Sequence, residues 1–183
     1  MANYIGQCIT PRVSSDHIAK VKVPVGGLNA GEVVVCDTLD NTISRNLEVY
    51  VGAQPATGNI TSKHLAVVVN GGFETLADGR RPDGQPDFTK YSYKEGEIAT
   101  VVFLDAHLFF EISVDSVGEG KTVATPASDI GKYLIPADGT NALKVNVDNN
   151  GVGGSLKIMA IRNFPIGGLY GAGFCNTYIC VAQ

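Results

Sequence analysis

Short apolar segments that end at turn residues recur along the chain about every 8–15 residues, and this rhythm constrains the fold most. Leu47, Val49 and Val51 alternate with Asn46, Glu48 and Tyr50, which is the period of a half-buried strand. No long window carries the 3.6-residue period of an amphipathic helix. The sequence therefore predicts an all-β fold, a sandwich or barrel-like β module with long loops and very little helix.

Two of the expected strands, residues 33–36 and 66–69, are apolar at every position. A strand with no polar alternation is typically covered on both faces, so these segments should lie between two layers of structure. Short turns of helix are expected near residues 61–64 and 128–130. Further strands are expected at residues 18–23, 98–104, 108–114, 133–135, 143–147, 156–161 and 177–181.

Changes in composition divide the chain into three parts. Residues 1–17 are predicted to form an N-terminal arm, residues 18–115 the main β domain, and residues 116–183 a smaller C-terminal β region packed on the main domain. Residues 116–126, rich in Gly, Thr and Ala, would link the two β units. The polar segment 77–87, with two Pro and two Gly, is expected to be an exposed loop. Residues 148–154 are expected to form a hairpin loop.

No motif predicts catalysis, a metal site or a cofactor site. The histidines His17, His64 and His107 lack the spacing of a metal-binding pair. His107 is the best candidate for a base, because Asp105 lies two residues away and could orient it. The four cysteines are expected to be reduced thiols, and the glycines of residues 167–173 to form a loop rather than a phosphate cradle.

Charge and hydropathy narrow the choice of partners. The formal net charge is -4 with no basic cluster, which argues against a nucleic-acid-binding face. No apolar run is long enough to cross a membrane, and no secretory leader is recognisable, so synthesis in the cytoplasm is expected. Only 17% of residues are charged, below the usual ~25%. This deficit predicts that part of the surface is covered by association, most simply as a trimer.

The N-terminal arm provides the candidate contact residues Tyr4, Ile5, Ile9 and Arg12. Its apolar side chains are too few for a strand pair of their own, and Pro11 limits pairing beyond that point. The arm is therefore expected to add a strand to a sheet edge of a neighbouring subunit. The alternative is that residues 3–9 form an ordinary first strand of the same domain.

Three segments resemble the small virion structural proteins of tailed bacteriophages, in particular head decoration or capsid cement proteins. They are GGLNAGEVVVCD at residues 26–37, YKEGEIA at residues 93–99 and SDIGKYL at residues 128–134. The resemblance implies a β-rich module, often trimeric, that sits on the outside of a capsid and contacts the major capsid protein. It implies no catalysis and no cofactor.

A second function remains open at this stage, a receptor- or carbohydrate-binding β module of a phage fiber or tail. Such a module would use exposed Tyr, Asp and Asn side chains on loops such as residues 78–93. The absence of Trp weakens this alternative, because sugar rings so often stack on Trp.

Overall fold

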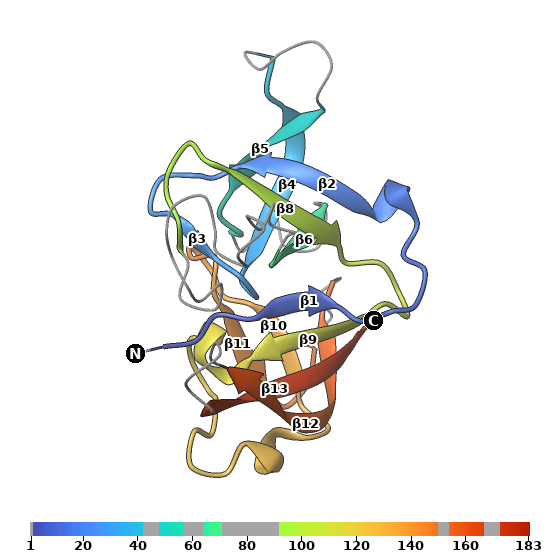
Figure 1. The fold of residues 1–183 in the computed structure, drawn as a ribbon, viewed down its shortest axis with the longest axis vertical. Helices are drawn as coiled ribbons and strands as arrows, with labels where there is room; N and C mark the ends of the chain where they lie inside the picture. The colour runs from blue at the N-terminus through green and yellow to red at the C-terminus, as the bar shows by residue number, and fades with distance from the viewer. Residues whose placement is uncertain (1, 42–47, 57–63, 71–91, 150–153, 167–172) are drawn as a thin grey trace.

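The computed structural model describes residues 2–41, 48–56, 64–70, 92–149, 154–166 and 173–183, and within them the fold is all-β, as predicted (Figure 1). Among these residues, helix is limited to short 3-10 turns, and no described helix is long and apolar enough to cross a membrane. The strands are β1 Gly6–Cys8, β2 Ile18–Lys22, β3 Leu28–Asn29, β4 Val33–Leu39, β5 Val49–Ala53, β6 Leu65–Val69, β7 Ser92–Tyr93, β8 Ile98–Phe103, β9 Phe109–Ser113, β10 Tyr133–Pro136, β11 Leu143–Asn146, β12 Leu156–Ile166 and β13 Gly173–Ala182; the 3-10 turns are η1 Ser15–His17, η3 Val114–Ser116 and η4 Pro126–Asp129.

Five strands close into a barrel in the order β2-β5-β4-β6-β8. The β2–β5 pair is parallel and the other four pairs are antiparallel. Closure leaves the barrel without a free edge strand. The short pair β3–β7 lies beside it, and Leu28 and Tyr93 from this pair pack into the barrel interior.

The remaining six strands form an antiparallel sheet in the order β1-β9-β13-β12-β10-β11. Both edges of this sheet are occupied. At one edge, β1 lies between the sheet and the barrel (Figure 1), and the Gly6 carbonyl accepts a hydrogen bond from the Asn70 amide at 2.6 Å. At the other edge, the amides of Gly118 and Val145 make hydrogen bonds that join β11 to residues 118–119.

The main hydrophobic core lies between the barrel and the sheet. Val33, Val67 and Val102 point out of the barrel and pack with sheet residues such as Phe110 and Tyr178. Their neighbours along the strands point into the barrel and form a second cluster. The all-apolar segments, residues 33–36 of β4 and 66–69 of β6, are therefore covered on both faces, as the sequence predicts.

The predicted division of the chain differs from the structure in two ways. The 18–115 boundary is wrong because β9 belongs to the sheet, so the chain leaves the barrel after Phe103. Residues 116–126, the predicted linker, are partly built into the sheet region, because Ser116 and Val117 are buried and residue 117 bridges to Leu143. A C-terminal unit made of residues 116–183 alone would lack β1 and β9, two strands of its own sheet.

The predicted N-terminal arm is also corrected. Residues 6–8 pair with β9 of the same chain, from Gly6 opposite Ile112 to Cys8 opposite Phe110. The alternative, an ordinary first strand, describes this segment. The physical reason is that β9 offers an antiparallel edge, which β1 fills with backbone hydrogen bonds.

The strands that flank residues 148–154 do not form a hairpin, because β10 lies between β11 and β12 in the sheet. The expected helical turn near residue 128 is η4. The loop predicted at residues 77–87 and most of the glycine-rich segment 167–173 fall outside the described residues, as do most of residues 61–64.

Candidate functional site

The four predicted contact residues occupy different environments. The Ile5 side chain is 1% exposed and belongs to the core, so it cannot contact a partner in this conformation. Tyr4 and Ile9 are half-buried, and Arg12 is exposed with a left-handed φ of 76°. The structure thus leaves three of the four accessible, and Ile9 lies beside another accessible apolar residue, Phe109.

Ile9 follows β1 on the face of the six-stranded sheet that points away from the barrel. Its amide donates to the Phe109 carbonyl at 2.8 Å, which continues the β1–β9 ladder by one residue. Phe109 lies opposite Val181, and Ile179 lies opposite Ala160. Because alternate residues share a face, these five apolar residues form two neighbouring cross-strand rows: Ile9, Phe109 and Val181 in one, Ile179 and Ala160 in the other.

We call these five residues, Ile9, Phe109, Ala160, Ile179 and Val181, the sheet-face patch. Phe109 is 40% exposed and the other four are half-buried. Its polar border includes Lys157, which lies opposite Val181 on β12. The patch is therefore a shallow apolar surface on a regular β-sheet, accessible in the single chain.

A buried carboxylate braces this face of the sheet. Glu111, opposite Ile179 on β9, is fully buried and accepts three hydrogen bonds from three different strands. Gln7 Nε2 donates to it at 2.8 Å, Thr177 Oγ1 at 2.7 Å and Arg162 Nη1 at 3.1 Å. Four strands are thereby tied together beside the patch, which stiffens the surface that carries Phe109.

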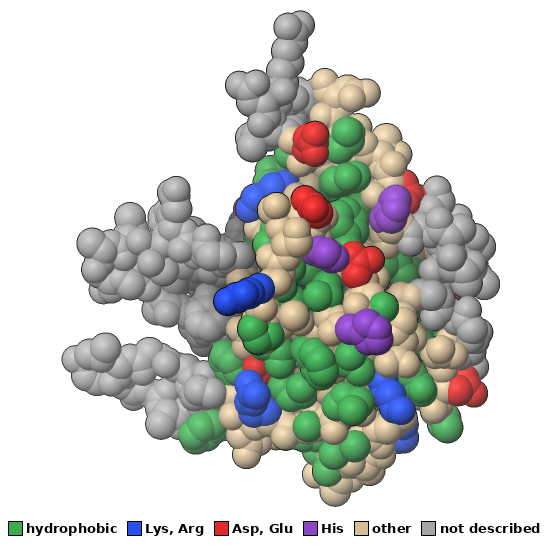
Figure 2. All heavy atoms as spheres, turned by 90° about the vertical axis from the view of Figure 1, so that its right-hand side faces the viewer, with side chains coloured by type: hydrophobic (Ala, Val, Ile, Leu, Met, Phe, Trp, Pro, Cys, Tyr) green, Lys and Arg blue, Asp and Glu red, His purple; other side chains and the backbone are tan. Residues whose placement is uncertain are grey.

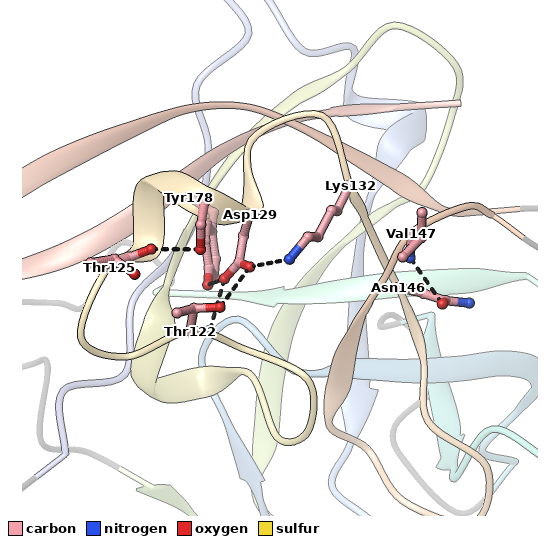
Figure 3. Close-up of polar contacts among 8 residues, drawn as sticks. Thr122, Thr125, Asp129, Lys132, Asn146, Val147 and Tyr178 are labelled. Atoms are coloured by element: carbon pink, nitrogen blue, oxygen red, sulfur yellow. Dashed lines mark hydrogen bonds and ion pairs between the residues drawn. The ribbon is translucent and has the colours of Figure 1, made fainter.

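A second buried carboxylate, Asp129, ties a loop to the sheet (Figure 3). It accepts hydrogen bonds from the Thr122 amide and hydroxyl, from Lys132 Nζ at 2.8 Å and from the Tyr178 hydroxyl at 2.7 Å. Burial alone would raise the pKa of Asp129, but the hydrogen bonds from Lys132, Thr122 and Tyr178 outweigh it and lower the pKa to about 2. The group is ionised at neutral pH and has a structural role.

A groove of about 280 Å³ opens at one end of the barrel, lined by residues of η1, β2, β5 and β8 and by Glu48, which precedes β5. The aromatic rings of Tyr50 and Phe103 pack edge-to-face there, with ring centroids 5.8 Å apart. Both side chains pack against the barrel interior and are half-buried. We call this groove the barrel-mouth groove; its lining is Ser15, Asp16, Ile18, Ala19, Lys20, Glu48, Tyr50 and Phe103.

The histidines are brought together with other side chains, but not as the sequence predicts. Asp105 Oδ2 lies 2.9 Å from His17 Nε2, so the carboxylate expected to orient His107 binds His17 instead. His107 occupies the β8–β9 turn with a φ of 72°, and its amide donates to the Ala182 carbonyl. Figure 2 shows the histidines with charged side chains over the upper part of one side of the molecule, and hydrophobic side chains gathered below them.

Two of the cysteines, Cys36 and Cys180, are poor candidates for a reactive centre. All four are thiols, and burial raises the pKa of Cys36 to about 12, with Asp37 adding to the effect. Burial also raises the pKa of Cys180. Thiols held protonated at neutral pH are poor nucleophiles and poor metal ligands. Among the described residues, no group of three or more His, Cys, Asp or Glu is placed to hold a metal ion.

Comparison with known proteins adds no assignment, since no protein-family model, curated protein or solved structure matches this chain. The sheet-face patch and the barrel-mouth groove were both missed by sequence reasoning. The alternation of residues 109–113 does carry a signal for the patch, because it places Phe109 and Glu111 on one face. The groove is lined by residues from separate segments of the chain, and no local sequence pattern predicts such a site.

Proposed function

We propose that this chain is a non-enzymatic structural protein of a tailed bacteriophage virion that binds the outside of the capsid and stabilises or decorates it. It would be made in the host cytoplasm and carried on the capsid surface, with the major capsid protein as its partner. The observation that carries the proposal is the sheet-face patch, an accessible apolar surface on a braced β-sheet.

The patch has the composition of the centre of a protein interface. Aromatic and aliphatic side chains without charge are enriched there, while charged residues stay at the rim. Phe109 would be the anchor, since it is the largest and most exposed side chain of the patch. Because Glu111 ties the strands beneath it, the surface needs no rearrangement to bind.

One copy of the patch is small. Its five residues compare with the roughly 20–30 residues that each partner contributes to a standard interface. Several linked copies would bind a repeating lattice far more tightly than one copy, because each further contact becomes intramolecular. This supports the proposal that the chain acts as an oligomer, most simply a trimer, on a capsid built of repeated subunits.

The test is co-sedimentation with shells assembled from the major capsid protein of the same virion. The unmodified chain should pellet with shells, and Phe109→Ser should weaken binding by about tenfold or more, equivalent to about 1.4 kcal/mol per site. The matched control is Phe174→Ser, which removes another exposed Phe, at 67% exposure, from the opposite face of β13.

The control should pellet like the unmodified chain. Absence of pelleting by the unmodified chain would refute capsid binding, and an equal loss in both variants would refute the patch as the contact surface. Light scattering during size-exclusion chromatography tests the oligomer separately, and a monomer at all concentrations would exclude the trimer.

A further inference from the structure

One border of the sheet-face patch carries a positive charge, on Lys157 of β12. Leu156 and Ile158, on either side of it, belong to the shared core, so the Lys157 side chain points to the outer face of the sheet. Lys157 lies opposite Val181 of the patch, and Val181 in turn lies opposite Phe109. The charge and the most exposed side chain of the patch therefore belong to one cross-strand row.

Tyr133 of β10 continues this row and fixes the position of the charge. It lies opposite Lys157 in the sheet, and Lys157 Nζ lies over its ring, 5.9 Å from the ring centroid. A cation in this position is attracted by the π electrons of the ring. Both residues are half-buried. The ammonium group is therefore held beside the patch, against the outer face of the sheet.

Two other cations on or next to the sheet already have carboxylate partners, whereas Lys157 does not. Arg162, on the same strand, donates to Glu111 at 3.1 Å, and Lys132, just before β10, lies 2.8 Å from Asp129. The ammonium group of Lys157 forms no ion pair or hydrogen bond with any residue that the structure describes. A half-buried ammonium group without a counter-charge is well placed to pair with a carboxylate that arrives on a partner.

We propose that the sheet-face patch binds a segment of the major capsid protein that carries a carboxylate next to apolar side chains. The apolar side chains would pack on Phe109 and Val181, and the carboxylate would pair with Lys157. Neighbouring strands lie about 4.8 Å apart, so the two contacts on the partner should be separated by about 10–15 Å. This inference rests on the proposed capsid role and adds the chemistry of the partner surface to it.

A protein carboxylate fits this surface better than the phosphates of a nucleic acid. A face that binds nucleic acid places several cations along the phosphate backbone, whereas the strands next to Lys157 in this row contribute only Val181 and Phe109. A charge at the rim of an apolar centre is the arrangement of a protein interface. Phe109 would therefore act as the anchor, and Lys157 as a residue that determines specificity.

The experiment is co-sedimentation of the full chain with capsid shells at about 50 and about 300 mM NaCl, on either side of physiological screening. Lys157→Met keeps an unbranched apolar side chain and removes the charge. We expect this variant to bind about fivefold or more weakly at the lower salt. Raising the salt should weaken binding of the unmodified chain several-fold and change binding of Lys157→Met little. Lys157→Arg keeps the charge and should bind like the unmodified chain.

The matched control is Lys94→Met, which removes an exposed Lys between β7 and β8. It should bind like the unmodified chain and keep the same salt dependence. Shells whose surface carboxylates have been converted to amides test the partner. They should bind the unmodified chain about fivefold or more weakly than untreated shells do, and bind Lys157→Met equally well before and after treatment. Lys94 and Lys157 both lie outside the cores, so each variant is expected to fold.

The inference is overturned if Lys157→Met binds untreated shells as tightly as the unmodified chain, or if Lys94→Met loses as much binding. It is also overturned if amidation weakens binding of Lys157→Met equally, or if Lys157→Met breaks up an oligomer in light scattering, which would place the patch between copies of this chain. When the unmodified chain pellets and Phe109→Ser does not, these results reject the partner chemistry alone. Absence of pelleting by the unmodified chain rejects the capsid role as well.

Discussion

The barrel and the six-stranded sheet are stabilised in different ways. Inside the barrel, the core is mostly small side chains, with Val34, Cys36, Ala66, Val68 and Ala99 all fully buried. The sheet contributes larger ones to the shared core, among them Phe110, Leu134, Leu143, Ile158 and Tyr178. The strands of the small barrel fill its interior mostly with small side chains, to which β3 and β7 add Leu28 and Tyr93, whereas the open sheet must fill the space against its neighbour.

The two regions also differ in how they use polar groups. The closed barrel has no edge strand, whereas the sheet has two edges and is joined by long connections. Glu111 and Asp129, both fully buried, connect these parts because they accept hydrogen bonds from separate strands and loops. The sheet is therefore braced by polar contacts, and this makes it a fixed platform for the sheet-face patch.

The largest expected effect comes from removing the polar brace of the sheet. Asp129→Ala leaves the ammonium group of Lys132 and the buried hydroxyl of Tyr178 without their shared acceptor. Loss of one partner in such a buried network costs about 3–5 kcal/mol. For a chain of this size that lowers the Tm by about 10 °C or more. Glu95→Gln, which removes an exposed charge on the barrel side, is the control, and an equal fall in both would refute the contrast.

The next prediction concerns the contact between the sheet and the barrel. A Cβ on Gly6 would clash with the backbone of Gly31 and with the Val68 carbonyl, so Gly6→Ala cannot keep β1 in place. We expect a loss of about 2 kcal/mol or more in the free energy of unfolding, measured by urea denaturation. Gly96→Ala is the control, since Gly96 has a positive φ but open space around it. A neutral Gly6→Ala would show that β1 is not part of the folded unit.

Acid should reduce the stabilisation that Asp129 provides, over a defined range of pH. The pKa of Asp129 falls from 3.8 to about 2 on folding, so the ionised form adds stability that is complete above its ordinary pKa. That contribution, about 2 kcal/mol, is lost as the pH falls from about 4 to about 2. The difference in unfolding free energy between the unmodified chain and Asp129→Asn should shrink over this range. A difference that does not change with pH would contradict the assignment.

The smallest expected effect on stability is at the sheet-face patch. Phe109→Ser changes an accessible side chain on the outer face, so the Tm should move by only a degree or two, about 0.5 kcal/mol. Phe110→Ser, one residue along the same strand, points into the shared core and should cost several kcal/mol. Thermal unfolding of the two variants tests which side chains of β9 point into the core. A similar fall in Tm for both variants would contradict the orientation described here.

The all-β fold could be predicted because alternation and turn residues are local signals. The place of β9 in the six-stranded sheet could not be predicted. Glu111 and Ser113 suggest a strand with one solvent-exposed face, yet both are buried. Gln7, Thr177 and Arg162 donate hydrogen bonds to Glu111 from distant parts of the chain, and the Ile5 amide donates to the Ser113 hydroxyl. A three-residue strand such as β1 is likewise invisible to periodicity, and its pairing depends on an edge that forms only in the folded sheet.

We propose that the outer face of the sheet contacts the capsid while the barrel mouth stays free. Hydroxyl-radical footprinting by mass spectrometry measures it directly, because Phe109 and Tyr50 are both accessible and both readily oxidised. On binding to capsid shells, the oxidation rate of Phe109 should fall several-fold while that of Tyr50 is unchanged. Protection of Tyr50 with Phe109 still reactive would place the capsid contact on the barrel and contradict the account.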